Sequence, residues 1–289
     1  MTSSAAVVCA FVLASSPEGQ HAAAKAEERD GPFSLRYHSF GDPALAAFLS
    51  AAWIATELGK NVLAPSGCRL CDRDPDGVDR LNRFDSWGRG ARWPTLNAQH
   101  TADTLSNIIS GAVIPATLVG LDIALARAAG RDQHAAEDLV LVAKTAAAAL
   151  LLNQTVKFWA ARERPFVHVL TPEERLDVDD PLDKNLSFFS GHATFAFTTV
   201  VAAGTLAELR SYRGRALIWI VGLPLAASVA YLRMAADKHY LSDVLVGAAV
   251  GTAFGVGIPL LLHPREERAG TVQVRLLPSP RGVSLFARF

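Results

Sequence analysis

The sequence has little cysteine, no excess of charge of either sign and few segments that predict β-strands. It contains 28 Lys and Arg against 28 Asp and Glu, so the formal net charge is zero. A neutral chain lacks the electrostatic surface that attracts nucleic acid or another polyanion, and we expect neither kind of partner. Apolar residues make up 50% of the 289 residues, which is ample for a hydrophobic core. Because strand signals are scarce before the C-terminal tail, we expect a helical protein.

The three cysteines give little support to a metal or redox site. Cys68 and Cys71 form a Cys-x2-Cys pair, but no second pair exists to complete a zinc site, and Cys9 lies near the N-terminus. No βαβ pattern accompanies the pair, which argues against a redox motif. Residues 72–77 begin like a calcium loop, yet Arg83 stands where the bidentate glutamate belongs. If the chain is exported, a local disulfide between Cys68 and Cys71 fits best.

The N-terminal residues resemble an export signal. Ala5–Ala14 forms a short apolar run followed by small residues, although the positively charged start of a signal is missing. The run is too short to span a bilayer, and a disordered start is the alternative. We expect four parts: a signal peptide at 1–24, a cap segment with the cysteine pair at 25–103, a helical catalytic domain at 104–264, and a tail at 265–289.

Six apolar segments predict helices, and the tail predicts a β-hairpin. The helices are expected at Ala44–Leu58, Thr104–Ala126, Leu139–Trp159, Ala193–Leu209, Ala216–Leu232 and Val244–Leu262. The last two lack charged residues over nearly the ~18 residues that a membrane span requires. In the tail, apolar residues alternate on both sides of the turn-forming segment Pro278–Gly282, which is typical of a hairpin.

Three short polar groups interrupt the apolar helices between Lys157 and Asp243. In the first group, Lys157 and Arg164 are seven residues apart, about two helical turns, so a continuing helix would carry both on one face. Pro165 disfavours the helical conformation at Arg164, so we expect the helix to end there and its last cations to point into a loop. Taken alone, the pattern also fits basic residues that complement a helix dipole.

The second group ends in Ser190-Gly191-His192, immediately before an apolar helical run. Ser190 suits a helix N-cap, Gly191 permits close approach of a ligand to the backbone, and His192 falls in the first turn. The N–H groups at a helix start bind anions, and a histidine beside them could deliver a proton. The alternative is an ordinary N-cap with an incidental histidine.

The third group runs from Arg233 to Asp243. His239 and Asp243 are four residues apart on one helical face, so the carboxylate can fix the tautomer of the ring. The other ring nitrogen is then left to act as a nucleophile. Arg233 reaches the same place only if the chain turns near residues 235–238. A purely structural His–Asp pair is the alternative.

The order Lys-x6-Arg-Pro, Ser-Gly-His and Arg-x5-His-x3-Asp resembles the signature of the type 2 phosphatidic acid phosphatase (PAP2) and vanadium haloperoxidase superfamily. The resemblance covers the middle third of the chain by motif and residues 104–264 by helix pattern. Phe189 stands where the family usually has proline, and Leu232 stands where it usually has serine. Neither departure removes a catalytic group, so both concern the loops.

The resemblance implies an all-α helical bundle and a phosphatase that works through a phosphohistidine. His239 would attack phosphorus, Asp243 would orient it, and His192 would protonate the leaving oxygen. The phosphoryl oxygens would be held by Lys157, Arg164, Ser190, Gly191 and Arg233. This agrees with the chemistry, since the charge spread over the transferred group needs several fixed donors. The cations take the part of a metal, so no metal or other cofactor is expected, and vanadate should inhibit.

Loop charges favour a membrane location. If the five helices from Thr104 onward span, the arginines of linkers 127–138 and 209–215 lie on one side and the aspartates of linker 160–192 on the other. This follows the positive-inside rule and places the motifs at the non-cytoplasmic face of the cell envelope. The segment from Asp72 to Trp93 is expected to form a solvated or interfacial cap beside the site.

The expected substrate is therefore a phosphomonoester or diphosphate of a lipid. Three other functions stay open: a haloperoxidase with vanadate as cofactor on His239, a soluble periplasmic or secreted non-specific acid phosphatase, and a non-catalytic membrane scaffold. The presence of all six motif side chains argues against the scaffold. The sequence does not predict an oligomeric state.

Overall fold

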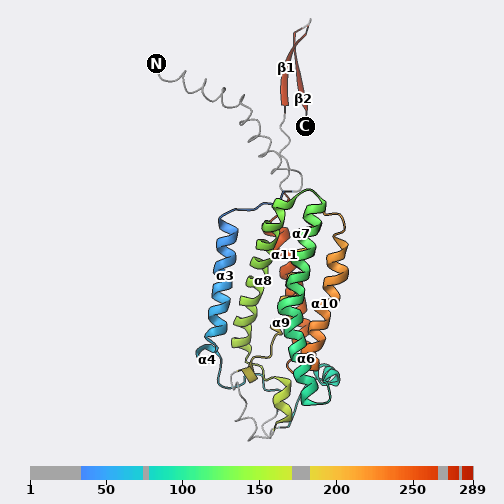
Figure 1. The fold of residues 1–289 in the computed structure, drawn as a ribbon. Helices are drawn as coiled ribbons and strands as arrows, with labels where there is room; N and C mark the ends of the chain where they lie inside the picture. Colours follow the sequence, from blue (N-terminus) through green and yellow to red (C-terminus); the bar gives the residue numbers. More distant parts are fainter. Residues whose placement is uncertain (1–33, 74–77, 171–182, 266–272, 280–281, 289) are drawn as a thin grey trace. The chain divides into compact units, whose positions relative to one another are not determined.

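The computed structural model describes residues 34–73, 78–170, 183–265, 273–279 and 282–288, the last two ranges by their backbone (Figure 1). The chain divides into two units, one formed by residues 37–263 and the other by residues 1–36 with 264–289. The predicted signal peptide at 1–24 lies outside the described residues. The predicted domain boundaries stay predictions, although a helix from Leu96 to Ile108 runs through residue 104.

The larger unit is a bundle of long helices that run side by side (Figure 1). These are α3 (Gly41–Leu58), α6 (Leu96–Ile108) continued by the π-helical η2 (Ile109–Val113) into α7 (Ile114–Ala128), α8 (Asp132–Ala160), α9 (Gly191–Leu209), α10 (Ala216–Ala235) and α11 (Leu241–Leu262). The short elements are α4 (Lys60–Leu63), α5 (Arg83–Gly88), η1 (Arg89–Ala91), η3 (Pro165–Val169) and η4 (Asp183–Asn185). The all-α class is confirmed.

Helix α9 lies at the centre of the bundle, in contact with α7, α8, α10 and α11. Gly247, Gly251 and Gly255 recur every four residues on α11 and so share one face. A Cβ at Gly251 would lie 2.6 Å from the backbone oxygen of Thr194, so the two helices pack backbone against backbone. This close packing fixes the start of α9 beside the start of α11, where two of the three polar groups lie.

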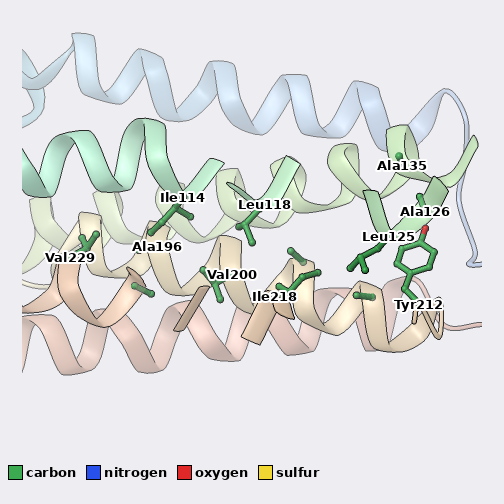
Figure 2. Close-up of a cluster of buried hydrophobic side chains, with 13 residues drawn as sticks. Ile114, Leu118, Leu125, Ala126, Ala135, Ala196, Val200, Tyr212, Ile218 and Val229 are labelled. Atoms are coloured by element: carbon green, nitrogen blue, oxygen red, sulfur yellow. The ribbon is translucent and has the colours of Figure 1, made fainter. Parts of the chain in front are cut away.

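A cluster of buried apolar side chains joins α7, α9 and α10 (Figure 2). It includes Ile114 and Leu118 of α7, Val200 of α9 and Val229 of α10, all essentially inaccessible to solvent. Because these side chains are apolar and close-packed, they hold the helices in register. The core thus supports the end of the bundle that carries the polar groups without contributing polar atoms to it.

Two helices begin seven or eight residues earlier than the sequence predicts. The helix predicted from Thr104 begins at Leu96, where the Thr95 side chain accepts a hydrogen bond from the Ala98 N–H. The helix predicted from Leu139 begins at Asp132. The reason is a buried ion cluster. The Arg210 guanidinium lies 2.9 Å from an Asp138 oxygen and 2.7 Å from a Glu137 oxygen. Glu137 and Asp138, whose charges made this stretch look like a linker, therefore belong to a packed helix.

In the other unit, strands β1 (Gln273–Ser279) and β2 (Gly282–Arg288) pair antiparallel, with Ser279 opposite Gly282. The predicted C-terminal hairpin is therefore present.

Among the described residues, three helices are long and apolar enough to cross a membrane, judged by length and composition: Leu96–Ala128, Ala216–Ala235 and Leu241–Leu262. The other two predicted spans correspond to α8 and α9, which are not among these three. Helix α9 is largely buried inside the bundle.

Candidate active site

The three polar groups converge on one cavity of about 620 Å³. That volume lies within the range of ligand pockets, roughly 300–1,000 Å³. Six of the predicted site residues line it: Lys157, Arg164, Gly191, His192, Arg233 and His239. Ser190 and Asp243, the other two, are completely buried behind the lining.

The first group reaches the cavity by a sharp change in chain direction. Helix α8 ends at Ala160, and Ala161 adopts the left-handed conformation with φ 45°. The helix thus ends one residue after the predicted range Leu139–Trp159 and does not run on to Arg164, so a shared helical face does not explain the convergence. Arg164 is extended, as its position before Pro165 predicts. It donates to the Lys238 carbonyl oxygen at 3.0 Å and lies 3.3 Å from His239 Nε2.

The second group opens α9. The Ser190 side chain accepts from the Ala193 N–H, so Ser190 is the predicted N-cap. A Cβ on Gly191 would lie 3.0 Å from Asn153 Oδ1 and 3.4 Å from Lys157 Nζ. Glycine therefore lets the Lys157 ammonium lie close to the helix start, where backbone N–H groups favour an anion.

The third group contains the predicted turn. After α10 ends at Ala235, the N–H groups of Lys238 and His239 both donate to the Arg233 carbonyl oxygen, at 3.1 and 3.3 Å. This turn brings Arg233 and His239 to the same cavity. His239 Nδ1 lies 3.6 Å from Asp243 Oδ2, which leaves Nε2 directed toward Arg164.

The Asp243 carboxylate is held by several donors. Oδ2 accepts from the Ser187 hydroxyl at 2.5 Å and from the Tyr240 N–H at 3.0 Å. Oδ1 accepts from Arg162 Nη1 at 2.8 Å. Its position beside His239 is thus determined by the protein and not by the histidine alone.

Helix α6 supplies site residues that the sequence analysis missed. Arg233 Nη1 forms an ion pair with Asp103 and donates to Ser106 Oγ at 3.0 Å. His192 Nε2 lies 2.7 Å from Asn107 Oδ1. The spacing of Asp103 and Asn107 at i and i+4, which places both on one face of the helix, was an available signal. The signal was missed because the helix was predicted to begin at Thr104, one residue after Asp103.

The electrostatics of the cavity act strongly on His192. Burial is the largest cause that lowers its pKa well below the usual value, followed by repulsion from Arg233, His239, Lys157 and Arg164. The ring is therefore neutral at neutral pH when only these groups face it. A phosphate dianion placed among the cations would raise the pKa of the ring again, because it favours the charged form.

The cap segment contacts the site through the cysteine loop. Cys68 and Cys71 are joined by a disulfide, with their Cα atoms 5.4 Å apart. The Arg69 N–H donates to the Ala161 carbonyl oxygen, and the Glu163 N–H donates to the Leu70 carbonyl oxygen, both at 3.0 Å. Within the described residues, no group of three or more His, Cys, Asp or Glu is placed to hold a metal ion.

Part of the chain matches a known protein family. Residues 138–267, which contain all three polar groups, match the family described as the PAP2 superfamily. No curated protein matches the chain. Among solved structures, it is similar to that of the first transmembrane PAP2 type phosphatidylglycerolphosphate phosphatase from Bacillus subtilis. The identity is 17% and the TM-score 0.42, over 70% of this chain and 92% of that one.

Proposed function

We propose, on the premise that residues 138–267 match the PAP2 superfamily, that the protein is a lipid phosphate phosphatase that transfers a phosphoryl group to His239 and then to water. The observation that carries the proposal is the convergence of the three motif cations, Lys157, Arg164 and Arg233, with two histidines on one cavity. Phosphoryl transfer depends on positioning and on stabilisation of charge, and this set of groups supplies both.

The residues take defined roles in the proposed reaction. His239 Nε2 attacks phosphorus, so that a P–N bond forms while the bond to the leaving oxygen breaks. His192 gives its proton to that oxygen and later takes one from the water that cleaves the P–N bond. Asp243 stabilises the charge that develops on the His239 ring. Lys157, Arg164 and Arg233 hold the phosphoryl oxygens, with the N–H groups at the start of α9, so no metal is required.

A second cavity supports a lipid as substrate. It has a volume of about 360 Å³ and lies between α3, α7, α8 and α9. Its lining is almost wholly apolar, as with Leu118 and Val142. Trp53, Leu150 and Phe195 line both cavities, so the apolar one begins where the phosphate site ends. A hydrocarbon chain attached to the phosphate would enter it and leave water.

The proposed location is the membrane, with the site on the non-cytoplasmic side. In the part of the chain that the structure describes, three helices have the length and composition of spans, and large apolar side chains such as Ile220 and Leu261 are exposed on α10 and α11. The site lies at the Lys157 end of α8. The arginine-containing loops 127–131 and 210–215 lie at the other end of the helices, which fits positive charge on the cytoplasmic side.

A substrate screen tests the proposed function. We expect phosphate release from phosphatidate, phosphatidylglycerol phosphate or a polyprenyl diphosphate with a higher kcat/KM than from a soluble aryl phosphate, and inhibition by vanadate. Ala143→Phe adds a ring at an exposed position of the apolar cavity. It should lower kcat/KM for the lipid about 10-fold or more and leave the aryl phosphate unchanged, since about 1.4 kcal/mol of lost chain binding is a factor of ten.

The matched control is Ala253→Phe, an equal increase in volume at an exposed position on α11. It should leave both substrates unaffected. Equal rates on lipid and aryl phosphates, insensitive to Ala143→Phe, would instead describe a non-specific acid phosphatase. Vanadate-dependent bromide oxidation without phosphate release would describe a haloperoxidase.

Cysteine labelling tests the placement. In a Cys9→Ser background, Gly90→Cys should react with an impermeant maleimide in intact cells. Gln133→Cys should react only after permeabilisation. Gly90 is exposed near the site and has open space for a side chain, and Gln133 is exposed at the opposite end of α8. Labelling of both in intact cells, with release of the protein by osmotic shock, would overturn the membrane location and leave the phosphatase assignment standing.

A further inference from the structure

Arg162 is a buried arginine that does not line the cavity. It lies two residues before Arg164, and its side chain is 7% exposed. Its guanidinium contacts three carboxylates: Nη1 at 2.8 Å from Asp243 Oδ1, Nη2 at 2.7 Å from Asp85 Oδ2, and Nε at 3.0 Å from Asp72 Oδ2. The Tyr240 ring covers the guanidinium, with the centroid 4.1 Å from the central carbon. Such planar, many-donor recognition of carboxylates is specific to arginine.

Asp85 fixes this guanidinium from the other side. It is completely buried at α5, and its oxygens accept from the Ser242 N–H and hydroxyl, both at 2.8 Å. Burial alone would raise the pKa of Asp85, but hydrogen bonds from Arg162, Ser242 and Asn82 outweigh it and hold the pKa below its usual value. The carboxylate therefore stays charged at neutral pH. Within the segment predicted as a solvated or interfacial cap, most described residues are exposed, but Asp85 is part of the interior.

The contacts of Asp243 divide its two oxygens between two tasks. Oδ1 accepts from Arg162, whereas Oδ2 faces His239 Nδ1 and accepts from Ser187 and the Tyr240 N–H. Rotation of the carboxylate would break the Arg162 contact. A guanidinium that is itself held by Asp85 and Asp72 thus keeps Oδ2 aimed at the histidine.

We propose that Arg162 and Asp85 are positioning residues that hold the Asp243 carboxylate in the orientation that directs His239 Nε2 at the phosphoryl group. The inference rests on the proposed function and extends it to residues without contact to the substrate. Asp85 lies outside residues 138–267, so the N-terminal segment completes the support of the nucleophile. Partners of this kind that orient a reacting group typically change activity 10- to 100-fold when removed.

Steady-state kinetics of Arg162→Gln, Arg162→Lys and Asp85→Asn test the proposal. Each variant should lose about 10- to 100-fold in kcat, with KM and the vanadate inhibition constant within about twofold of wild type, because the cations of the cavity are untouched. Arg162→Gln also removes a positive charge beside Asp243. The charged form of His239 is then favoured, and the acid limb of kcat/KM should move to higher pH.

Arg162→Lys separates charge from geometry. It keeps the charge but not the planar fork, so kcat should fall while the acid limb stays near that of wild type. A loss of folded protein would lower kcat without moving the limb, and vanadate binding counts the folded sites. The matched control is Arg73→Gln, since Arg73 is a partly buried arginine that pairs with Glu163 at 2.9 Å and does not contact Asp243. It should keep wild-type kcat and pH profile.

Wild-type kcat and an unmoved acid limb in Arg162→Gln would overturn the positioning role. Equal losses in Arg73→Gln would also overturn it, by showing that any buried ion pair here has the same effect. Absence of phosphate release by the wild-type protein is a different result, which refutes the proposed function itself.

Discussion

Replacing His239 with alanine is expected to abolish phosphate release from every substrate while inorganic phosphate still binds. The three cations that would hold the phosphoryl oxygens remain in the variant, but the nitrogen that we propose attacks phosphorus is gone. Removal of a covalent nucleophile costs on the order of 10⁴- to 10⁶-fold in kcat. A rapid base quench of the wild type with ³²P-labelled lipid should trap an acid-labile, base-stable label on the protein, and the variant should show none.

The matched control for this experiment is His100→Ala. His100 is exposed on α6 and does not line the cavity, so its loss should leave both turnover and labelling intact. Turnover by His239→Ala at the wild-type rate would refute His239 as the nucleophile. Label in the wild type that survives acid would point to a residue other than histidine.

Replacing His192 with alanine is expected to slow alkyl phosphates by about 10²- to 10⁴-fold, the usual contribution of a general acid. Aryl phosphates should be slowed far less, because their leaving oxygens need little protonation. Rates measured across leaving groups of graded pKa should therefore show a steeper dependence in the variant than in the wild type. Equal slowing of all substrates would mean that His192 binds phosphate and does not donate a proton.

The pH dependence of the wild type gives a second readout of the same residue. The pKa of His192 in the free protein lies well below its usual value, chiefly through burial and then through repulsion by Arg233, His239, Lys157 and Arg164. A bound phosphate dianion raises it. The protonated acid is lost as pH rises through each pKa, so kcat/KM should decline at lower pH than kcat. In His192→Ala this difference should disappear.

The fold was largely open to prediction because its helices are long and apolar. The core faces of α9, α10 and α11 are continuous in the sequence, and the hairpin carries its own turn residues. The ends of the helices were harder to predict from the sequence. Nothing in the local sequence marks Ala161 for the left-handed conformation, which glycine usually adopts. That residue nevertheless decides how Arg164 reaches the cavity.

The site was predictable where one segment carries a recognisable group, and not where the group depends on distant contacts. Lys157, His192 and His239 lie in short motifs with defined spacing. The pairing of Arg162 with Asp85 joins residues 77 positions apart, and that of Arg233 with Asp103 joins residues 130 apart. A single charged residue on α5 or α6 does not identify which arginine the fold will bring to it.

Under the proposed positioning role, the disulfide loop makes the support of His239 depend on the redox state of the compartment in which the chain folds. Cys71 immediately precedes Asp72, which contacts Arg162, and Leu70 pairs with the backbone beside that arginine. In a reducing cytosol the two thiols would stay apart, and the segment that carries Asp72 would lose its covalent closure. The support of His239 would then be complete only after the chain has reached an oxidising compartment.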